Sequence, residues 1–95
     1  MVELQPGQLV RSLAGRDKGK HYLVLREIDH KYVLLVDGSG RPLGRPKKKN
    51  KAHLQPYERR ANLGELLEIK NLSDSQVIEF LKNLVPETGI PEEEV

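Results

Sequence analysis

Basic side chains gather around a glycine-containing loop near the N-terminus, and side chains of this type could bind phosphate groups. Three cations, Arg16, Lys18 and Lys20, occupy every second position of the loop. Glycine adopts positive φ at little steric cost, so Gly15 and Gly19 would let the backbone and the basic side chains approach phosphates closely. We therefore expect these three cations to contact the phosphates of a polyanion.

A second basic cluster follows in the middle of the chain. The segment from residue 41 to residue 51 has six Lys or Arg and no acidic residue. Pro42 and Pro46 disfavour a helix and leave a mobile arm or an edge strand. Phosphate contacts add up through counterion release, so two clusters on one face would give useful affinity for a nucleic acid. The predicted phosphate contacts are Arg41, Arg45, Lys47, Lys48, Lys49 and Lys51, with Asn50 and His53 as candidate base or ribose contacts.

The distribution of charge also favours a polyanionic partner. Residues 1–60 contain 14 Lys and Arg against 6 Asp and Glu, whereas residues 61–95 contain 2 against 8. A solvated charged surface is the alternative explanation, but the clustering of the cations favours nucleic acid.

Catalysis finds little support in the sequence. There is no cysteine, and the three histidines, His21, His30 and His53, lack the paired spacing of a metal site. The glycine loop departs from a P-loop, since three residues separate Gly15 from Gly19 and no Ser or Thr follows Lys20. We expect no enzyme activity, no metal and no cofactor.

The elements that would position the basic residues are mainly strands. Strands are expected at residues 8–13, 22–28 and 32–36, with turns between them. Residues 52–54 would return to the sheet, where Pro56 ends the strand. The second and third strands are continuous apolar runs, so both of their faces need cover, and a C-terminal helix is the available cover.

That helix is expected to start at Ser73. Ser73 and Gln76 have the spacing of a capping box, and Pro86 ends the helix. Its apolar stripe consists of Val77, Ile78, Leu81, Leu84 and Val85. Residues 66–69 fit a strand or a helical turn equally well. Of the tyrosines, Tyr22 and Tyr32 are expected in the core and Tyr57 on the surface.

The length of 95 residues indicates one domain. We expect a barrel over residues 1–60 with a basic arm at 41–51, a closing segment and helix over 61–85, and a flexible acidic tail at 86–95. No apolar run approaches the roughly 20 residues that span a bilayer, and no signal-peptide pattern follows Met1. These features predict a cytoplasmic protein, monomeric when isolated.

Residues 7–20, running into the strand 22–25, resemble a KOW motif, the strand–loop–strand RNA-binding element of several ribosomal proteins and transcription factors. Gly19 matches the characteristic glycine of that motif, whereas Tyr22 stands where many KOW motifs have a second glycine. Residues 28–38, 45–56 and 67–78 are similar to the ribosomal large-subunit protein family called fourteen-e. The resemblance implies a mainly β fold, a small SH3-like β-barrel with a short C-terminal α-helix packed on it. It also implies contact with ribosomal RNA, ribosomal proteins as further partners, and no enzyme activity.

A protein–protein adaptor is the alternative function, in which an SH3-like barrel grips a peptide. Peptide grooves of SH3 type depend on clustered surface aromatic residues. One Phe, three Tyr and no Trp are few for such a groove, and this argues against an adaptor.

Overall fold

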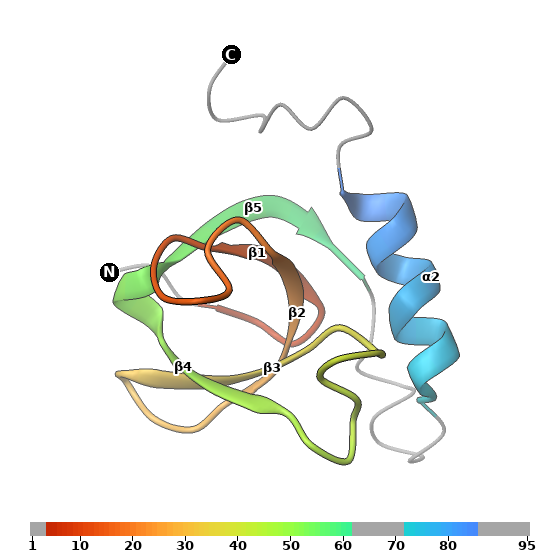
Figure 1. The fold of residues 1–95 in the computed structure, drawn as a ribbon, viewed down its shortest axis with the longest axis horizontal. Helices are drawn as coiled ribbons and strands as arrows, with labels where there is room; N and C mark the ends of the chain where they lie inside the picture. The colour runs from red at the N-terminus through yellow and green to blue at the C-terminus, as the bar shows by residue number, and fades with distance from the viewer. Residues whose placement is uncertain (1–3, 62–71, 86–95) are drawn as a thin grey trace.

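The computed structural model describes residues 4–61 and 72–85, and it shows a curved five-stranded antiparallel sheet with a helix beside it (Figure 1). The strand order is β4-β3-β2-β1-β5. This arrangement confirms the prediction of a small, mainly β, barrel-like domain with a C-terminal helix. The predicted closing segment at 66–69 and the acidic tail lie outside the described residues. The elements are β1 (Gln8–Ser12), β2 (His21–Glu27), β3 (Tyr32–Val36), β4 (Lys47–Asn50), the 3-10 helix η1 (Lys51–His53), β5 (Leu54–Arg60) and α2 (Asp74–Leu84).

A glycine-containing loop joins β1 to β2 and a short polar turn joins β2 to β3, as expected from the sequence. Between β2 and β3, the Asp29 carboxylate accepts hydrogen bonds of 2.8 Å from the backbone N–H groups of Lys31 and Tyr32. Such an Asx turn is the reason that Asp favours this position. The two bonds lower the pKa of Asp29. In the loop between β1 and β2, Gly15 and Gly19 have φ of 86° and 90°, as predicted.

Alternation along the strands divides the apolar side chains between two cores. The inner core, enclosed by the curved sheet, consists of Leu4, Val10, Tyr22, Val24, Val33, Leu35 and Leu54. The outer core lies between the sheet and α2, and it contains Leu9, Leu23, Val36, Tyr57, Ala61 and Val77. The helix therefore covers the outward face of the second and third strands, as the sequence predicts.

The helix α2 is fixed at both of its ends. At the start, the Ser73 hydroxyl accepts from the Gln76 N–H, and the Gln76 side chain accepts from the Ser73 N–H, which confirms the predicted capping box. At the end, the guanidinium of Arg59 on β5 donates to the carbonyl of Leu84 at 2.7 Å. This bond satisfies one of the carbonyls that the last helical turn leaves without a helical partner.

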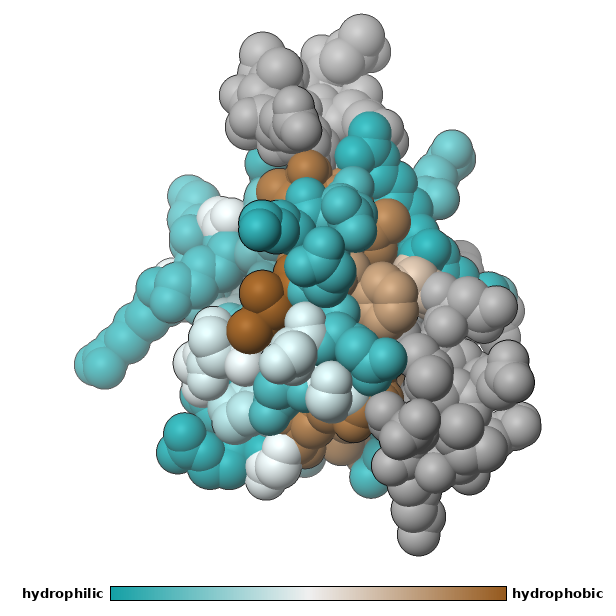
Figure 2. Space-filling model, turned by 90° about the vertical axis from the view of Figure 1, so that its right-hand side faces the viewer, coloured by the Kyte–Doolittle hydropathy of each residue, from teal (hydrophilic) through white to brown (hydrophobic). Residues whose placement is uncertain are grey.

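One member of the predicted apolar stripe is only partly buried and lies outside the outer core. Val77 is fully buried against the sheet, but Ile78 is 44% exposed, so the prediction that it lies in the stripe is wrong. Phe80 packs against the outer core instead. Figure 2 shows that hydrophilic side chains separate the hydrophobic patches on the helix-bearing face of the molecule.

The start of α2 holds the turn that precedes β4. The Asp74 carboxylate accepts from the backbone N–H of Leu43 at 2.7 Å. Gly38 has φ of 83°, and a Cβ added there would lie 2.6 Å from the Asp74 carbonyl oxygen and 2.7 Å from Cγ1 of Ile78. The close approach requires glycine, and it fixes the position of the segment that carries Arg41.

Two predictions about the segment after η1 are wrong. The strand β5 continues through Pro56 to Arg60, and Tyr57 is 3% exposed rather than on the surface. Among the described strands, β5 lies at one end of the strand order and pairs with β1 alone, so a residue without an N–H group is tolerated there. Of the other tyrosines, Tyr22 is in the core as predicted, whereas Tyr32 is half-buried, so the prediction that Tyr32 lies in the core is wrong.

Candidate nucleic-acid interface

The two basic clusters meet at one pocket, which we call the basic pocket. Its volume is about 250 Å³. The loop between β1 and β2 contributes two of its cations, and the segment from Asp37 to Lys47 contributes the other two. The pocket is lined by Arg16, Asp17, Lys20, Tyr22, Asp37, Gly40, Arg41 and Lys47. The fold thus joins cations that lie more than 20 residues apart in the sequence.

A buried carboxylate, Asp17, lies at one wall of the basic pocket, and it is 5% exposed. It accepts hydrogen bonds from the Ser12 hydroxyl at 2.8 Å and from the Tyr22 hydroxyl at 3.1 Å. The ammonium groups of Lys47 and Lys49 each lie 3.0 Å from one of its oxygens. We call these five residues the Asp17 cluster, and they connect the first loop with β1, β2 and β4.

The Asp17 cluster shifts two pKa values. Burial raises the pKa of Asp17, but the hydrogen bonds from Ser12, Lys47, Lys49 and Tyr22 outweigh it and hold the pKa far below the usual range. Burial, together with the negative charge of Asp17, raises the pKa of Tyr22 to about 12. At neutral pH the carboxylate is therefore ionised, and the phenol keeps the proton that it donates.

The remaining cations of the basic pocket keep their charge available to a ligand. Within residues 4–61 and 72–85, Arg16, Lys20 and Arg41 form no ion pair. Asp37, the second carboxylate at the pocket, accepts from the backbone N–H groups of Ser39 and Arg41. Four cations against two carboxylates leave a surplus of positive charge. This surplus suits an anionic ligand.

The lysine run of β4 does not act as a single surface. Because side chains alternate along a strand, Lys47 and Lys49 share one face and Lys48 lies on the other. The Lys48 ammonium lies 4.5 Å from the centre of the Tyr32 ring, a cation–π contact on the outer face of the sheet. Of the predicted basic arm at 41–51, Lys47–Asn50 form an edge strand, one of the two possibilities that the prolines left open, and residues 41–46 form a turn before it.

The other predicted contacts lie outside the basic pocket. Lys18, Arg45 and His53 are exposed. Lys51 forms an ion pair with Glu27 at the far end of β4. The Asn50 side chain accepts from the Ala52 N–H and so begins η1, a structural use of a residue predicted to contact RNA.

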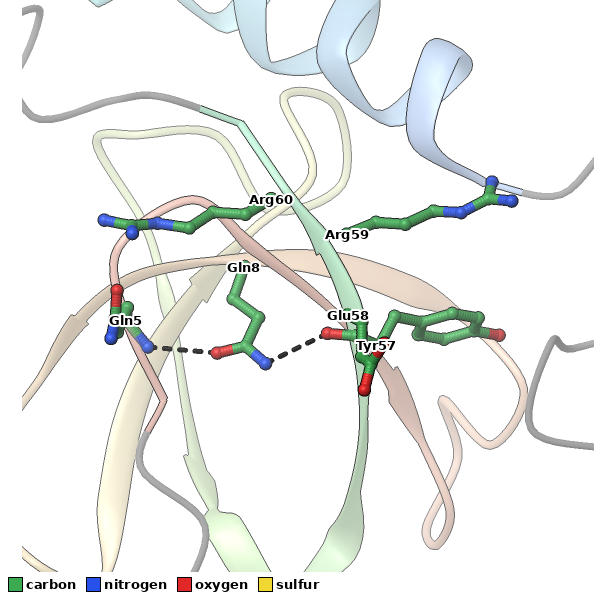
Figure 3. Close-up of a pocket in the computed structure, with 6 residues that line it drawn as sticks. All are labelled: Gln5, Gln8, Tyr57, Glu58, Arg59 and Arg60. Carbon is green, nitrogen blue, oxygen red and sulfur yellow. Dashed lines mark hydrogen bonds between the residues drawn. The ribbon is translucent and has the colours of Figure 1, made fainter.

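A second hollow, of about 240 Å³, lies beside β5 and is lined by Gln5, Gln8, Tyr57, Glu58, Arg59 and Arg60 (Figure 3). The Gln8 side chain spans it, accepting from the Gln5 N–H at 3.2 Å and donating to the Tyr57 carbonyl at 3.0 Å. Gln8 lies where the β1–β5 register shifts, so its side chain replaces a backbone hydrogen bond of the sheet. The side chains of Arg59 and Arg60 point away from each other, so they do not converge on a ligand (Figure 3).

Sequence reasoning missed the acidic and aromatic residues of the basic pocket. Asp17 was visible as an acid within a basic loop, which was a signal for an internal ion pair. Asp37 and Gly40 lie in the turn after β3 and were not among the predicted contacts, and Tyr22 was predicted only as core. No motif connects these residues with Lys47.

Comparison with known proteins does not assign the chain to a family. No protein-family model matches it, and no curated protein has significant sequence similarity to it. In the part of the chain that the structure describes, no three or more His, Asp or Glu side chains group so that they could hold a metal ion. No helix in residues 4–61 and 72–85 has the length and apolar character needed to cross a membrane. The fold and the pocket define the class: a small β-barrel-like domain with a basic pocket.

Proposed function

We propose that the protein binds RNA without catalysing a reaction, and that the basic pocket receives phosphates of the RNA backbone. The observation that carries this proposal is the convergence of Arg16, Lys20, Arg41 and Lys47 on one pocket from two separate segments. Arginine and lysine supply only N–H donors, which suits phosphate oxygens. Contacts to phosphates position a protein on RNA without reading its sequence.

Two further points favour RNA over the peptide ligand of an adaptor. Peptide grooves of SH3 type need exposed aromatic side chains, whereas Tyr22 and Tyr57 are both 3% exposed. The loop that carries Arg16 and Lys20 is also the loop of the KOW-like segment. Through that resemblance, ribosomal RNA is the first RNA to test, with the cytoplasm as the site of action.

The experiment is a titration of fluorescein-labelled single-stranded oligouridylate, followed by fluorescence anisotropy at several salt concentrations. Three or four phosphate contacts predict a slope of about −2 to −3 for log K against log salt. The double variant R16A/R41A should bind more weakly and flatten that slope by about 1.4, because two contacts are lost. The variant K82A is the control, because it also removes a positive charge but does so on α2. Lys82 is exposed and lies about 12 Å along the helix from Asp74 at its start.

The proposal fails if the wild-type protein does not bind the oligouridylate or a ribosomal RNA fragment. It also fails if R16A/R41A retains the affinity and the salt slope of the K82A control. Cross-linking in cells, followed by sequencing of the attached RNA, then identifies the natural ligand.

A further inference from the structure

The lysines of β4 differ in how tightly the protein holds them. The Lys49 ammonium donates to the Ala14 carbonyl at 2.9 Å and to Asp17 at 3.0 Å, and its side chain is 10% exposed. The Lys47 side chain is 23% exposed, and it both pairs with Asp17 and lines the basic pocket. Lys49 does not line the pocket. The two lysines share a carboxylate, but only one of them faces the place where a ligand would bind.

We infer that Asp17 is a positioning residue that divides the lysine run into three roles. Lys49 supports the loop, Lys47 contacts the phosphate of the ligand while Asp17 holds it, and Lys48 takes no part in the pocket. This inference rests on the proposed RNA binding at the same pocket. An ammonium group has three N–H donors, and Asp17 is the acceptor that the described residues give to Lys47. The other donors of Lys47 are therefore free for phosphate oxygens.

Holding Lys47 in place favours binding for an entropic reason. A free lysine loses side-chain rotamer entropy when a contact fixes it. The ion pair with Asp17 has already restricted Lys47 before the ligand arrives, so less entropy is lost on binding.

Asp17 also positions the cations that it does not touch. Its bonds with Ser12 and Tyr22 anchor the first loop to β1 and β2, and its bonds with the β4 lysines anchor the same loop to the opposite wall. The position of the loop that carries Arg16 and Lys20 relative to Lys47 on β4 is fixed in this way. Without the carboxylate, the two lysine ammonium groups would repel each other, and the loop would lose its attachment to β4.

The variant D17N separates this inference from a simple effect of net charge. The substitution raises the net charge by one, so electrostatics alone predicts tighter binding of RNA with a steeper salt slope. Positioning by Asp17 predicts the opposite, at least fivefold weaker binding of labelled oligouridylate. Tighter or unchanged binding by folded D17N overturns the inference.

Three single variants test the division of roles even if D17N fails to fold. Each phosphate contact multiplies the binding constant by the molar salt concentration raised to the power of about −0.7, which is roughly fivefold at ~0.1 M salt. K47A should therefore bind about fivefold more weakly, with a slope flatter by about 0.7. K48A should match the wild-type protein in affinity and slope. K49M should melt at a lower temperature, yet keep the wild-type slope when measured well below its melting temperature.

Failure of this inference is distinguishable from failure of the proposed function. If K47A, K48A and K49M change affinity and slope equally, the division of roles is wrong, but RNA binding at the pocket stands provided that R16A/R41A is impaired. If the wild-type protein binds no RNA, both proposals fall. If K49M alone flattens the slope, Lys49 is a contact residue and the assignment to Lys47 is overturned.

Discussion

The attachment of α2 to the sheet can be tested by comparing two neighbouring residues of the helix. Val77 is fully buried, while Ile78 is 44% exposed. V77A removes two methyl groups, worth about 1.6 kcal/mol in transfer free energy, and the cavity left behind adds about 1 kcal/mol. The higher helix propensity of alanine offsets about 0.5 kcal/mol of this loss in stability. The expected loss in the free energy of unfolding is therefore about 2 kcal/mol.

The substitution I78A serves as the matched control. It removes more carbon atoms than V77A, but from a side chain that is already 44% exposed, so it should cost less than about 1 kcal/mol. In a domain of this size, 1 kcal/mol corresponds to about 4–8 °C in melting temperature. Circular dichroism melts should therefore show a drop of roughly 8–16 °C for V77A and a clearly smaller drop for I78A. If I78A destabilises the protein as much as V77A, the orientation of α2 against the sheet is wrong.

Three other predictions concern the turn before β4, the start of α2 and the effect of pH. G38A should cost at least about 1–2 kcal/mol, because φ is 83° and the new Cβ would meet α2, whereas G44A, with open space around its Cβ, should melt like the wild type. S73A should lower stability by about 1 kcal/mol in urea titrations, through loss of the capping box. The folded pKa of Tyr22, raised to about 12, gives stability that is complete below pH ~10 and is lost as the pH rises towards 12. The depressed pKa of Asp17 gives stability that is present above pH ~4 and is lost in acid, so D17N should flatten the acid limb of the stability curve while Y22F flattens the alkaline limb.

Local patterns predicted the strands and the helix because those patterns have local causes. The capping box at Ser73 needs two side chains three residues apart, and both are visible in the sequence. The third strand was predicted with its observed bounds, since an apolar run of β-favouring residues lies between two turn signals.

The path of β5 could not be obtained in this way. Pro56 appeared to end the strand because the sequence does not show which strand will lie at the end of the strand order. The exposure of Tyr57 was inferred from its charged neighbours, but the shift in the β1–β5 register between Gln8 and Val10 decides which side chains face the core.

The candidate site was predictable in its residue types and not in its geometry. The cations of both clusters were identified, yet only Arg16, Lys20, Arg41 and Lys47 line the basic pocket. Lys47 and Lys49 are 30 and 32 residues from Asp17 in the sequence, and no short-range pattern connects them. The pairing of β3 with β4 sets Lys47 opposite Leu35, whereas Arg16, Lys20 and Arg41 reach the pocket from loops between strands.

The Asp17 cluster also explains how a protein can keep several cations close together before any ligand is bound. Like charges that line one pocket repel each other, and that repulsion opposes the folded state. A buried carboxylate that accepts from two lysines offsets part of the repulsion, and its low pKa keeps it ionised at neutral pH. Arg16, Lys20 and Arg41 are not neutralised by ion pairs within the described residues, so a ligand phosphate would supply the rest of the compensating charge. Binding of a polyanion should therefore raise the melting temperature of the wild-type protein more than that of R16A/R41A, since stabilisation by a ligand follows its affinity for the folded state.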